Sequence, residues 1–172
     1  WLPARHRAGH LRRFLQHLEQ PAAGTATELT LPLQRILDLV HRRSLMVLVS
    51  DLLAPLDDLA PALTALGACG HEMIVFQVLD PAELSFPFQG PAQFRDVETG
   101  HSLYVDPAVG RKRYLERLRG HLEAIDRVCQ ETGISFRRLP TDRPLELALF
   151  DFLSERARRR AFARRLQRPA AS

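Results

Sequence analysis

The sequence predicts an α/β fold built on a doubly wound, mostly parallel sheet. Two short apolar runs, Leu45–Val49 and Met73–Leu79, are typical of strands buried on both faces, and a helical pattern separates them. The 172 residues are 45% hydrophobic and 26% charged, which suits a single domain with a substantial core and argues against disorder.

Two helices are expected before the first strand. The first covers Gly9–Glu19, where an apolar stripe at helical spacing is formed by Leu11, Phe14, Leu15 and Leu18. It ends at the break Pro21–Gly24. The second begins near Thr30, and Pro32 suits its first turn because proline needs no N–H there. Thr27 therefore lies in the loop between the two helices.

A βαβ unit follows. The run Leu45–Val49 is predicted to be a central parallel strand, and the helix after it carries apolar residues from Leu56 to Leu66. Gly67 and Gly70 end that helix, and Met73–Leu79 forms the second strand. Parallel strands joined by a helix form a right-handed crossover.

An irregular stretch and a β-hairpin are expected next. The hairpin pairs Phe94–Val97 with Ser102–Val105, and Gly100 suits the positive φ of its loop. A long amphipathic helix then runs from Val109 to Cys129 and stops at Gly133. The third strand, Ile134–Leu139, carries two arginines and is therefore placed at a sheet edge.

The last helix carries Leu145, Leu149, Phe152 and Leu153 and continues into an arginine-rich tail. Seven arginines and no acidic residue follow Glu155, so the formal charge of +4 leaves residues 1–155 with a net charge of −3. We therefore divide the chain into a body, 1–155, and a helical tail, 156–172, whose charges face solvent. An acidic body argues against nucleic-acid binding. Truncation after Glu155 is expected to change thermal stability little.

No apolar run approaches the roughly 20 residues of a membrane span, so no membrane segment is expected in this chain. The chain begins at Trp1 without a methionine, which indicates a fragment or a processed product. Cys69 and Cys129 are interpreted as small core residues of a reducing compartment.

An aspartate follows each predicted strand: Asp51, Asp80 and Asp142. Ligands bind parallel sheets at this carboxyl edge. Asp80 and Asp142 stand before prolines at helix starts and are interpreted as caps. Asp51 is less obviously a cap, and with hydroxyls from a neighbouring loop it would suit Mg²⁺, a cation that prefers oxygen ligands.

Other candidate sites are weaker. His6, His10 and His17 could share a helix face, but they lack carboxylate or cysteine companions and are interpreted as surface residues. Ser50 lacks the Gly-x-Ser-x-Gly context of an exposed nucleophile. The glycine patterns of nucleotide-binding loops are absent from the sequence.

Several stretches together carry a resemblance to a known family. They are Leu45–Asp51, Gly70–Leu84, Phe88–Gly100 and Leu139–Leu145. In this order they resemble the bacterial family called domain of unknown function 58, over nearly the whole chain up to about Arg156. The resemblance implies a doubly wound domain of the von Willebrand A/Rossmann-like type, with a metal-ion-dependent adhesion site formed by three loops.

The resemblance also implies which residues would belong to that site. Thr27 would be the threonine of the second loop and Asp51 the aspartate of the third. The Asp-x-Ser-x-Ser segment of the first loop is not in this sequence, so the chain looks like the C-terminal part of the domain, with a partial site. We expect Mg²⁺ to bind the intact domain but not to bind this piece tightly, because too few oxygen ligands are present.

The leading functional hypothesis is a non-enzymatic protein-binding or scaffold module of the bacterial cytoplasm. By the resemblance, its partner would be a MoxR-type AAA+ ATPase acting in protein assembly or maturation. The alternative is a hydrolase that uses the aspartates at the strand ends.

Two structural expectations follow. The Thr27 hydroxyl and the Asp51 carboxylate should lie within roughly 3 to 7 Å of each other, with Asp51 partly exposed and not capping the next helix. The strand Leu45–Val49 should present an unpaired edge through which the chain self-associates.

Overall fold

The computed structural model describes residues 2, 7–20, 30–40, 42–95 and 100–166. Its central feature is a parallel sheet of three strands in the order β1-β2-β5, with bounds Leu45–Ser50, Glu72–Leu79 and Ser135–Pro140. A separate antiparallel pair is formed by β3, Ala92–Arg95, and β4, Ser102–Val105. The expected mixed α/β class with a mostly parallel sheet is therefore confirmed.

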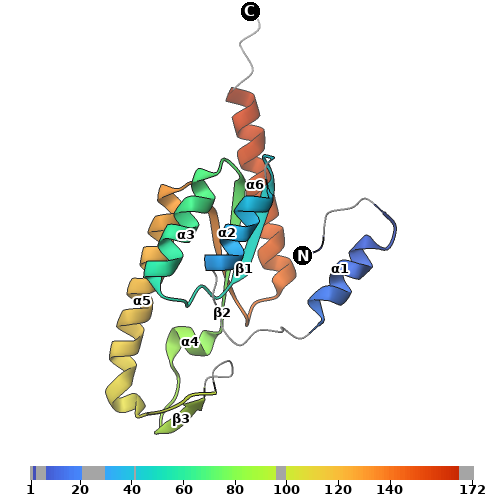
Figure 1. The fold of residues 1–172 in the computed structure, drawn as a ribbon. Coiled ribbons are helices and arrows are strands. Elements are labelled where there is room, and N and C mark those ends of the chain that lie inside the picture. Colours follow the sequence, from blue (N-terminus) through green and yellow to red (C-terminus); the bar gives the residue numbers. More distant parts are fainter. Residues whose placement is uncertain (1, 3–6, 21–29, 41, 96–99, 167–172) are drawn as a thin grey trace, which may run out of the picture.

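Helices cover both faces of the sheet (Figure 1). The helices α2 (Thr30–Leu39), α3 (Leu56–Ala68) and α5 (Pro107–Glu131) lie on one face, and α6 (Leu145–Leu166) lies on the other. The short helix α4, Pro81–Ser85, stands in the stretch that the sequence predicted to be irregular. The β1-α3-β2 unit is parallel, as predicted.

The strand β1 differs from its prediction as a central strand buried on both faces. Among the described strands, β1 pairs only with β2, which is the central and most buried strand. Leu45, Val47 and Val49 of β1 are exposed, while Met46 and Leu48 pack against the main core. An unbroken apolar run does not say how many of its faces are covered, and here helices cover only one.

The main core lies between the sheet and the helices α2, α3 and α5. Leu59, Leu63 and Leu66 of α3 meet Val75 of β2 and Ile125 of α5 there, and all are at most 1% exposed. A smaller cluster joins β2 to α6, where the rings of Phe76 and Phe152 meet edge to face. Because both faces of β2 are buried along most of its length, its sequence is apolar almost throughout.

The strand β5 lies at an edge of the described sheet, as its arginines predicted. The antiparallel pairing predicted for the hairpin is also confirmed: β3 starts two residues earlier than expected, and Phe94 is paired with Leu103. Residues 96 and 97 of the predicted strand lie outside the described residues. Gly100 has the positive φ of 72° that its loop position required.

The two cysteines have different environments. Cys129 is fully buried in the main core, where burial and the nearby Asp126 raise the pKa of its thiol to about 11. Cys69 is exposed at the end of α3, so its interpretation as a core residue is wrong. Both thiols are free.

The helix α6 runs without interruption across the predicted boundary between body and tail. Arg156, the first tail residue, forms an ion pair with Glu72 at the start of β2. The first turn of the tail therefore touches the body.

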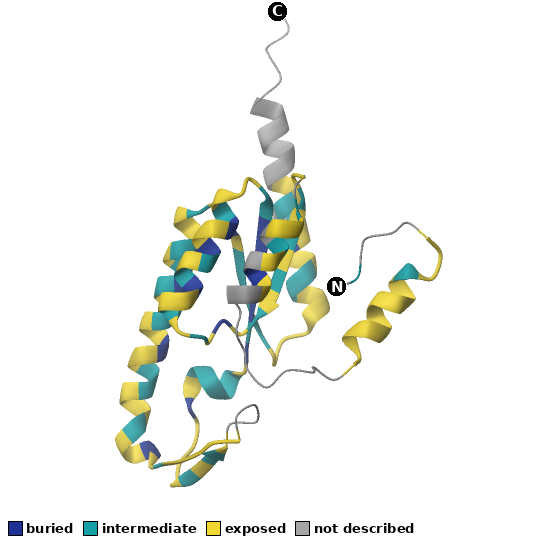
Figure 2. Ribbon diagram, viewed as in Figure 1, coloured by how far each residue is buried: buried dark blue, intermediate teal, exposed yellow. Residues whose placement is uncertain are grey.

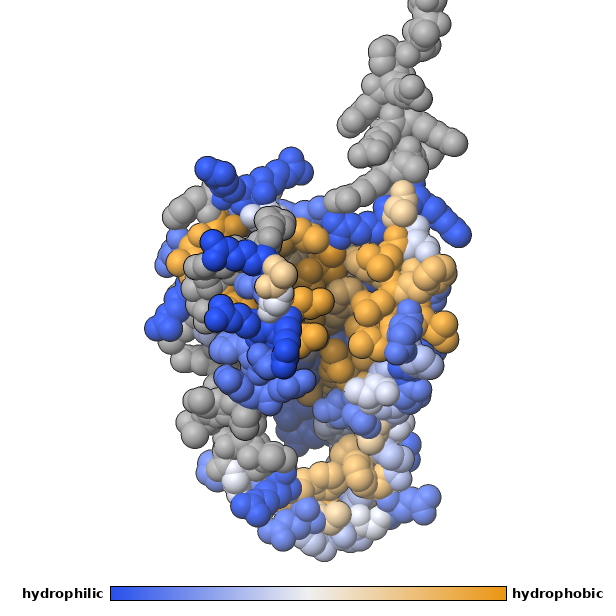
Figure 3. Space-filling model, turned by 90° about the vertical axis from the view of Figure 1, so that its right-hand side faces the viewer, coloured by the Kyte–Doolittle hydropathy of each residue, from blue (hydrophilic) through white to orange (hydrophobic). Residues whose placement is uncertain are grey.

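The helix α1, His10–Leu18, lies away from the sheet and contains no buried residue (Figures 1 and 2). Its predicted apolar stripe, Leu11, Phe14, Leu15 and Leu18, is exposed. Exposed apolar side chains also belong to β1 and to α6, where Phe150 and Leu153 are examples. Figure 3 views the molecule from the side on which α1 and α6 lie in Figure 1, and it shows apolar side chains gathered on that side.

Within the described part of the chain, none of the helices combines the length and apolar character needed to cross a membrane.

Candidate functional site

The carboxyl ends of β2 and β5 are tied together by Asp80 and Thr141. The Thr141 hydroxyl donates to Asp80 Oδ2 at 3.0 Å, and the Thr141 N–H donates to the Leu79 carbonyl at 3.0 Å. Asp80 Oδ1 also accepts from the Ala82 N–H at 2.7 Å, and Glu83 accepts from the Asp80 N–H at 2.8 Å. This is a capping box, so the structural interpretation of Asp80 is confirmed.

Asp142 does not have the capping role predicted for it. The helix α6 begins at Leu145, and the Pro144 carbonyl accepts the first helical hydrogen bonds, from Leu147 and Ala148. Asp142 precedes this cap by two residues and lies exposed in the turn. Because α6 begins only after Pro144, Asp142 lies too far from the first N–H groups of the helix to cap them.

Asp51 lies at the end of β1 and is exposed. Its Oδ1 accepts a hydrogen bond from the Leu53 N–H at 3.2 Å and lies 3.4 Å from the Ser50 hydroxyl. It does not cap α3, which begins after Pro55 without a side-chain cap, as predicted. The expectation that Asp51 would be only partly exposed is wrong, because it follows an edge strand with an open face.

The loop after β1, residues 51–55, is held in place by the buried side chain of Leu52 and by hydrogen bonds of its backbone. Leu52 adopts the left-handed conformation with φ of 54°, and its side chain is fully buried. Its N–H donates to the Ser50 hydroxyl at 3.1 Å. Its carbonyl lies 2.6 Å from Nε2 of His121 in α5. A carbonyl can only accept, so Nε2 of His121 carries the proton.

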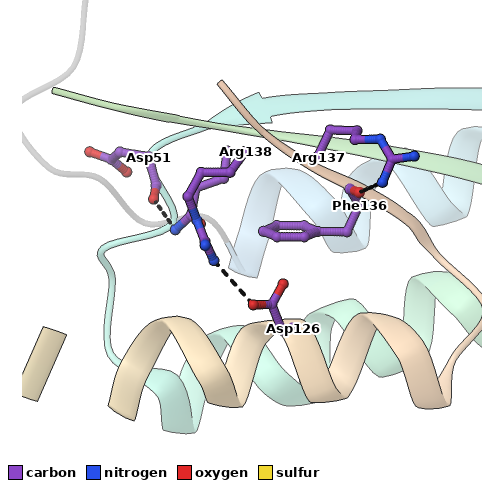
Figure 4. A network of polar contacts seen from close by, with 6 residues as sticks. Asp51, Asp126, Phe136, Arg137 and Arg138 are labelled. Atoms are coloured by element: carbon purple, nitrogen blue, oxygen red, sulfur yellow. Dashed lines mark hydrogen bonds and ion pairs between the residues drawn. The ribbon is translucent and has the colours of Figure 1, made fainter. Parts of the chain in front are cut away.

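A second anchor holds the Asp51 backbone (Figure 4). The side chain of Gln77, fully buried in β2, donates from Nε2 to the Asp51 carbonyl at 2.9 Å. Its Oε1 accepts from Arg138 Nε at 3.1 Å, and Arg138 reaches Asp126 Oδ2 at 3.2 Å. Three elements, β2, β5 and α5, therefore meet behind the loop that follows β1 and hold Asp51 in place.

This network was not foreseen from the sequence. Its one signal was Gln77 itself, a polar residue inside an otherwise apolar strand, which has to find hydrogen-bond partners when buried.

Thr27 lies outside the described residues, so its predicted approach to Asp51 stays a prediction. Asp51 fits an oxygen-ligand cation, because its carboxylate is exposed and Oδ1 is oriented by the Leu53 N–H. It supplies one carboxylate only. In the part of the chain that the structure describes, no three His, Cys, Asp or Glu side chains come together as a metal-binding group, and this includes His10 and His17 of α1.

Comparison with known proteins gives one family and several relatives. The family profile described as "Protein of unknown function DUF58" matches residues 1–124. An uncharacterized protein of Mycobacterium bovis and one of Mycobacterium tuberculosis are each 28% identical over 162 residues, which is 91% of this chain and 50% of theirs. An uncharacterized protein of Mycobacterium avium is 28% identical over 158 residues, 90% of both chains.

The chain thus spans about half the length of the first two relatives. No solved structure matches it.

Proposed function

The chain belongs to the family described as protein of unknown function DUF58, and on that premise we propose that it is a non-enzymatic protein-binding module of the von Willebrand A-like type. Its contact surface is the carboxyl edge of the parallel sheet. The observation that carries the proposal is Asp51, an exposed carboxylate on a loop held from behind by Gln77 and His121. A carboxylate fixed in this way is preorganised to bind rather than free to adapt.

In the proposed site of the intact domain, Asp51 and Thr27 would hold Mg²⁺ together with the oxygen ligands of the first loop. A bound Mg²⁺ supplies an open coordination position for an acidic side chain of the partner. The role of this chain is to keep the Asp51 carboxylate at the edge: the Gln77 amide and the His121 ring fix the backbone, and the Leu53 N–H orients Oδ1.

The partner in this proposal is a MoxR-type AAA+ ATPase, and the setting is protein assembly or maturation in the bacterial cytoplasm. The resemblance of the chain to its family suggests this partner class. An exposed carboxylate site that presents one fixed group suits the recognition of a protein surface.

The test uses the full-length natural protein that contains this chain and a purified MoxR-type ATPase from the same bacterium. Association is measured by biolayer interferometry with Mg²⁺ and with EDTA. We expect binding that requires Mg²⁺ and is lost in Asp51→Ala, which keeps the backbone carbonyl bonded to Gln77. The control Asp58→Ala removes an exposed carboxylate of α3 and should bind normally. Binding that ignores both EDTA and Asp51→Ala would contradict the proposal.

The hydrolase alternative requires a nucleophile with a base beside it. Two hydroxyls lie near carboxylates at this edge. The Ser50 hydroxyl is 3.4 Å from Asp51 Oδ1, a long contact that does not activate a serine. The Thr141 hydroxyl donates to Asp80 Oδ2 at 3.0 Å, but Asp80 already serves as the cap of α4. Turnover of p-nitrophenyl phosphate or p-nitrophenyl acetate that disappears in Ser50→Ala would favour this alternative over the binding module.

A further inference from the structure

An apolar cavity of about 690 Å³ opens beside the Asp51 loop. It lies between the hairpin, the first half of α5 and the loop after β1. Its apolar lining consists of Leu53, Phe86, Phe94, Leu103, Val105 and Leu118. Leu53 is 40% exposed and Leu103 is 66% exposed, so large apolar side chains face solvent inside a concave surface. Such surfaces in soluble proteins mark binding sites.

The rim of the cavity is positively charged. Arg113, Arg117 and His121 line it and follow one another at four-residue intervals along α5, so they share one face of the helix. No acidic residue lines the cavity. Among the described residues, no carboxylate forms an ion pair with Arg113 or Arg117. The two guanidinium groups are therefore available to a negatively charged ligand.

Packed aromatic side chains preform one wall of the cavity. Phe86 has a left-handed φ of 45° and contacts Tyr114 and Phe94 with ring centroids 4.8 and 5.8 Å apart. Phe88 meets Phe94 edge to face at 4.9 Å. Burial and the nearby Glu83 raise the pKa of the Tyr114 hydroxyl further above its ordinary value.

One residue belongs to both the cavity and the Asp51 loop. The Leu53 N–H binds the Asp51 carboxylate, and the Leu53 side chain lines the cavity. His121 likewise lines the cavity and holds the Leu52 carbonyl. A ligand in the cavity would therefore lie against the same loop that presents Asp51.

We propose that this cavity binds a peptide segment of the partner protein in which a large apolar side chain is flanked by aspartate or glutamate. The apolar side chain fills the cavity, and the carboxylates meet Arg113 and Arg117. A peptide suits the site better than a fatty acid, because the half-exposed walls would leave a long acyl chain largely in water. This inference rests on the proposed protein-binding function and names the chemistry of the partner segment.

The experiment uses the 172-residue chain with isotope-labelled leucine and valine methyl groups, observed by NMR in EDTA. The probe is the peptide acetyl-Gly-Asp-Phe-Leu-Glu-Gly-amide, and its matched control replaces both acidic residues with lysine. We expect the acidic peptide to shift the methyl signals of Leu53, Leu103 and Val105 with a Kd of roughly 0.1 to 1 mM. The lysine peptide should leave them unchanged. Arg117→Glu should raise the Kd about tenfold or more, and Arg127→Glu, an exposed site on α5 away from the cavity, should not.

The inference is overturned if the acidic peptide shifts none of these methyl signals, if the lysine peptide binds equally, or if Arg127→Glu weakens binding as much as Arg117→Glu. Decanoate provides a further arm: binding of decanoate at these methyl groups without binding of the peptide would assign the cavity to a lipid instead. Because the measurement is made in EDTA and repeated with Asp51→Ala, it does not depend on the metal site. Failure of the cavity therefore leaves a Mg²⁺-dependent partner interaction standing, and the reverse is also true.

Discussion

Gln77 is the single residue on which the geometry of the candidate site most depends. It is the one buried polar side chain among the described residues, and it links the Asp51 carbonyl of one strand end to Arg138 of another strand. A buried amide is tolerated only when its donor and acceptor are both satisfied, and here both are.

Replacement Gln77→Leu keeps the volume of the side chain but leaves the Asp51 carbonyl and the Arg138 guanidinium without this partner. We expect the free energy of unfolding to fall by about 2 kcal/mol, measured by urea denaturation. Gln130→Leu, at an exposed position of α5, is the matched control and should change the free energy by less than about 0.5 kcal/mol. Equal effects of the two substitutions would show that the network contributes no stability.

Among the elements, α3 and α5 pack closely because one residue lacks a side chain. A Cβ atom added to Gly67 of α3 would lie 2.6 Å from the Cβ of Thr132 and 3.1 Å from its carbonyl oxygen. Thr132 is the C-terminal cap of α5, and its hydroxyl donates to the Val128 carbonyl at 2.7 Å, so it cannot move away easily. Gly67 was predicted to end this helix, but α3 continues to Ala68, and the glycine instead allows α3 to pack closely against the end of α5.

Gly67→Ala is therefore expected to destabilise the protein by roughly 1 to 3 kcal/mol, although alanine is the better helix former. Gly120→Ala provides the matched control, because Gly120 lies inside α5 with nothing within 4 Å of the added Cβ. This control should gain up to about 1 kcal/mol. Thermal unfolding of both variants checks the opposite signs, and a gain in Gly67→Ala would contradict the close packing.

The ion pair between Arg156 and Glu72 alters the prediction for the arginine-rich tail. Truncation after Arg158 keeps the pair and should leave the melting temperature nearly unchanged. Truncation after Glu155 also removes Arg156, whose side chain is 18% exposed, and should cost up to about 1 kcal/mol because Glu72 is partly solvated. A large loss already after Arg158 would show that the distal tail packs on the body.

At the scale of the whole molecule, the strand β1 has an open outer edge and one face that no described helix covers. Its outer edge has no partner strand among the described residues, and Leu45, Val47 and Val49 expose apolar surface beside it. We expect the chain to self-associate with increasing concentration in sedimentation velocity. Val47→Lys should reduce this association, whereas Val109→Lys, at an 80% exposed position of α5, should not. A wild-type chain that stays monomeric would refute the expectation.

Local patterns predicted the elements well, because each depends on its own residues. The strands β1, β2 and β5 lie within about a residue of the apolar runs that indicated them. Contacts between distant segments were out of reach: the exposure of Cys69, the open face of β1 and the Gln77–Arg138 bond depend on which elements meet. For the candidate site, Asp51 was identified from its place after a strand, but the anchors behind it were not.

The strand order β1-β2-β5 has a consequence for how the chain folds. Residues paired between β1 and β2 lie 27 positions apart in the chain, as do Ser44 and His71, which are hydrogen-bonded next to this pair of strands. Residues paired between β2 and β5, such as Gln77 and Arg138, lie 61 positions apart. Pairing β2 with β5 closes the longer loop and therefore costs more conformational entropy. The hairpin and α5 lie within this loop, so we expect this pairing to form later than the pairing of β1 with β2. The β1-α3-β2 unit is thus the natural folding nucleus, and on a ribosome it could form before β5 is synthesised.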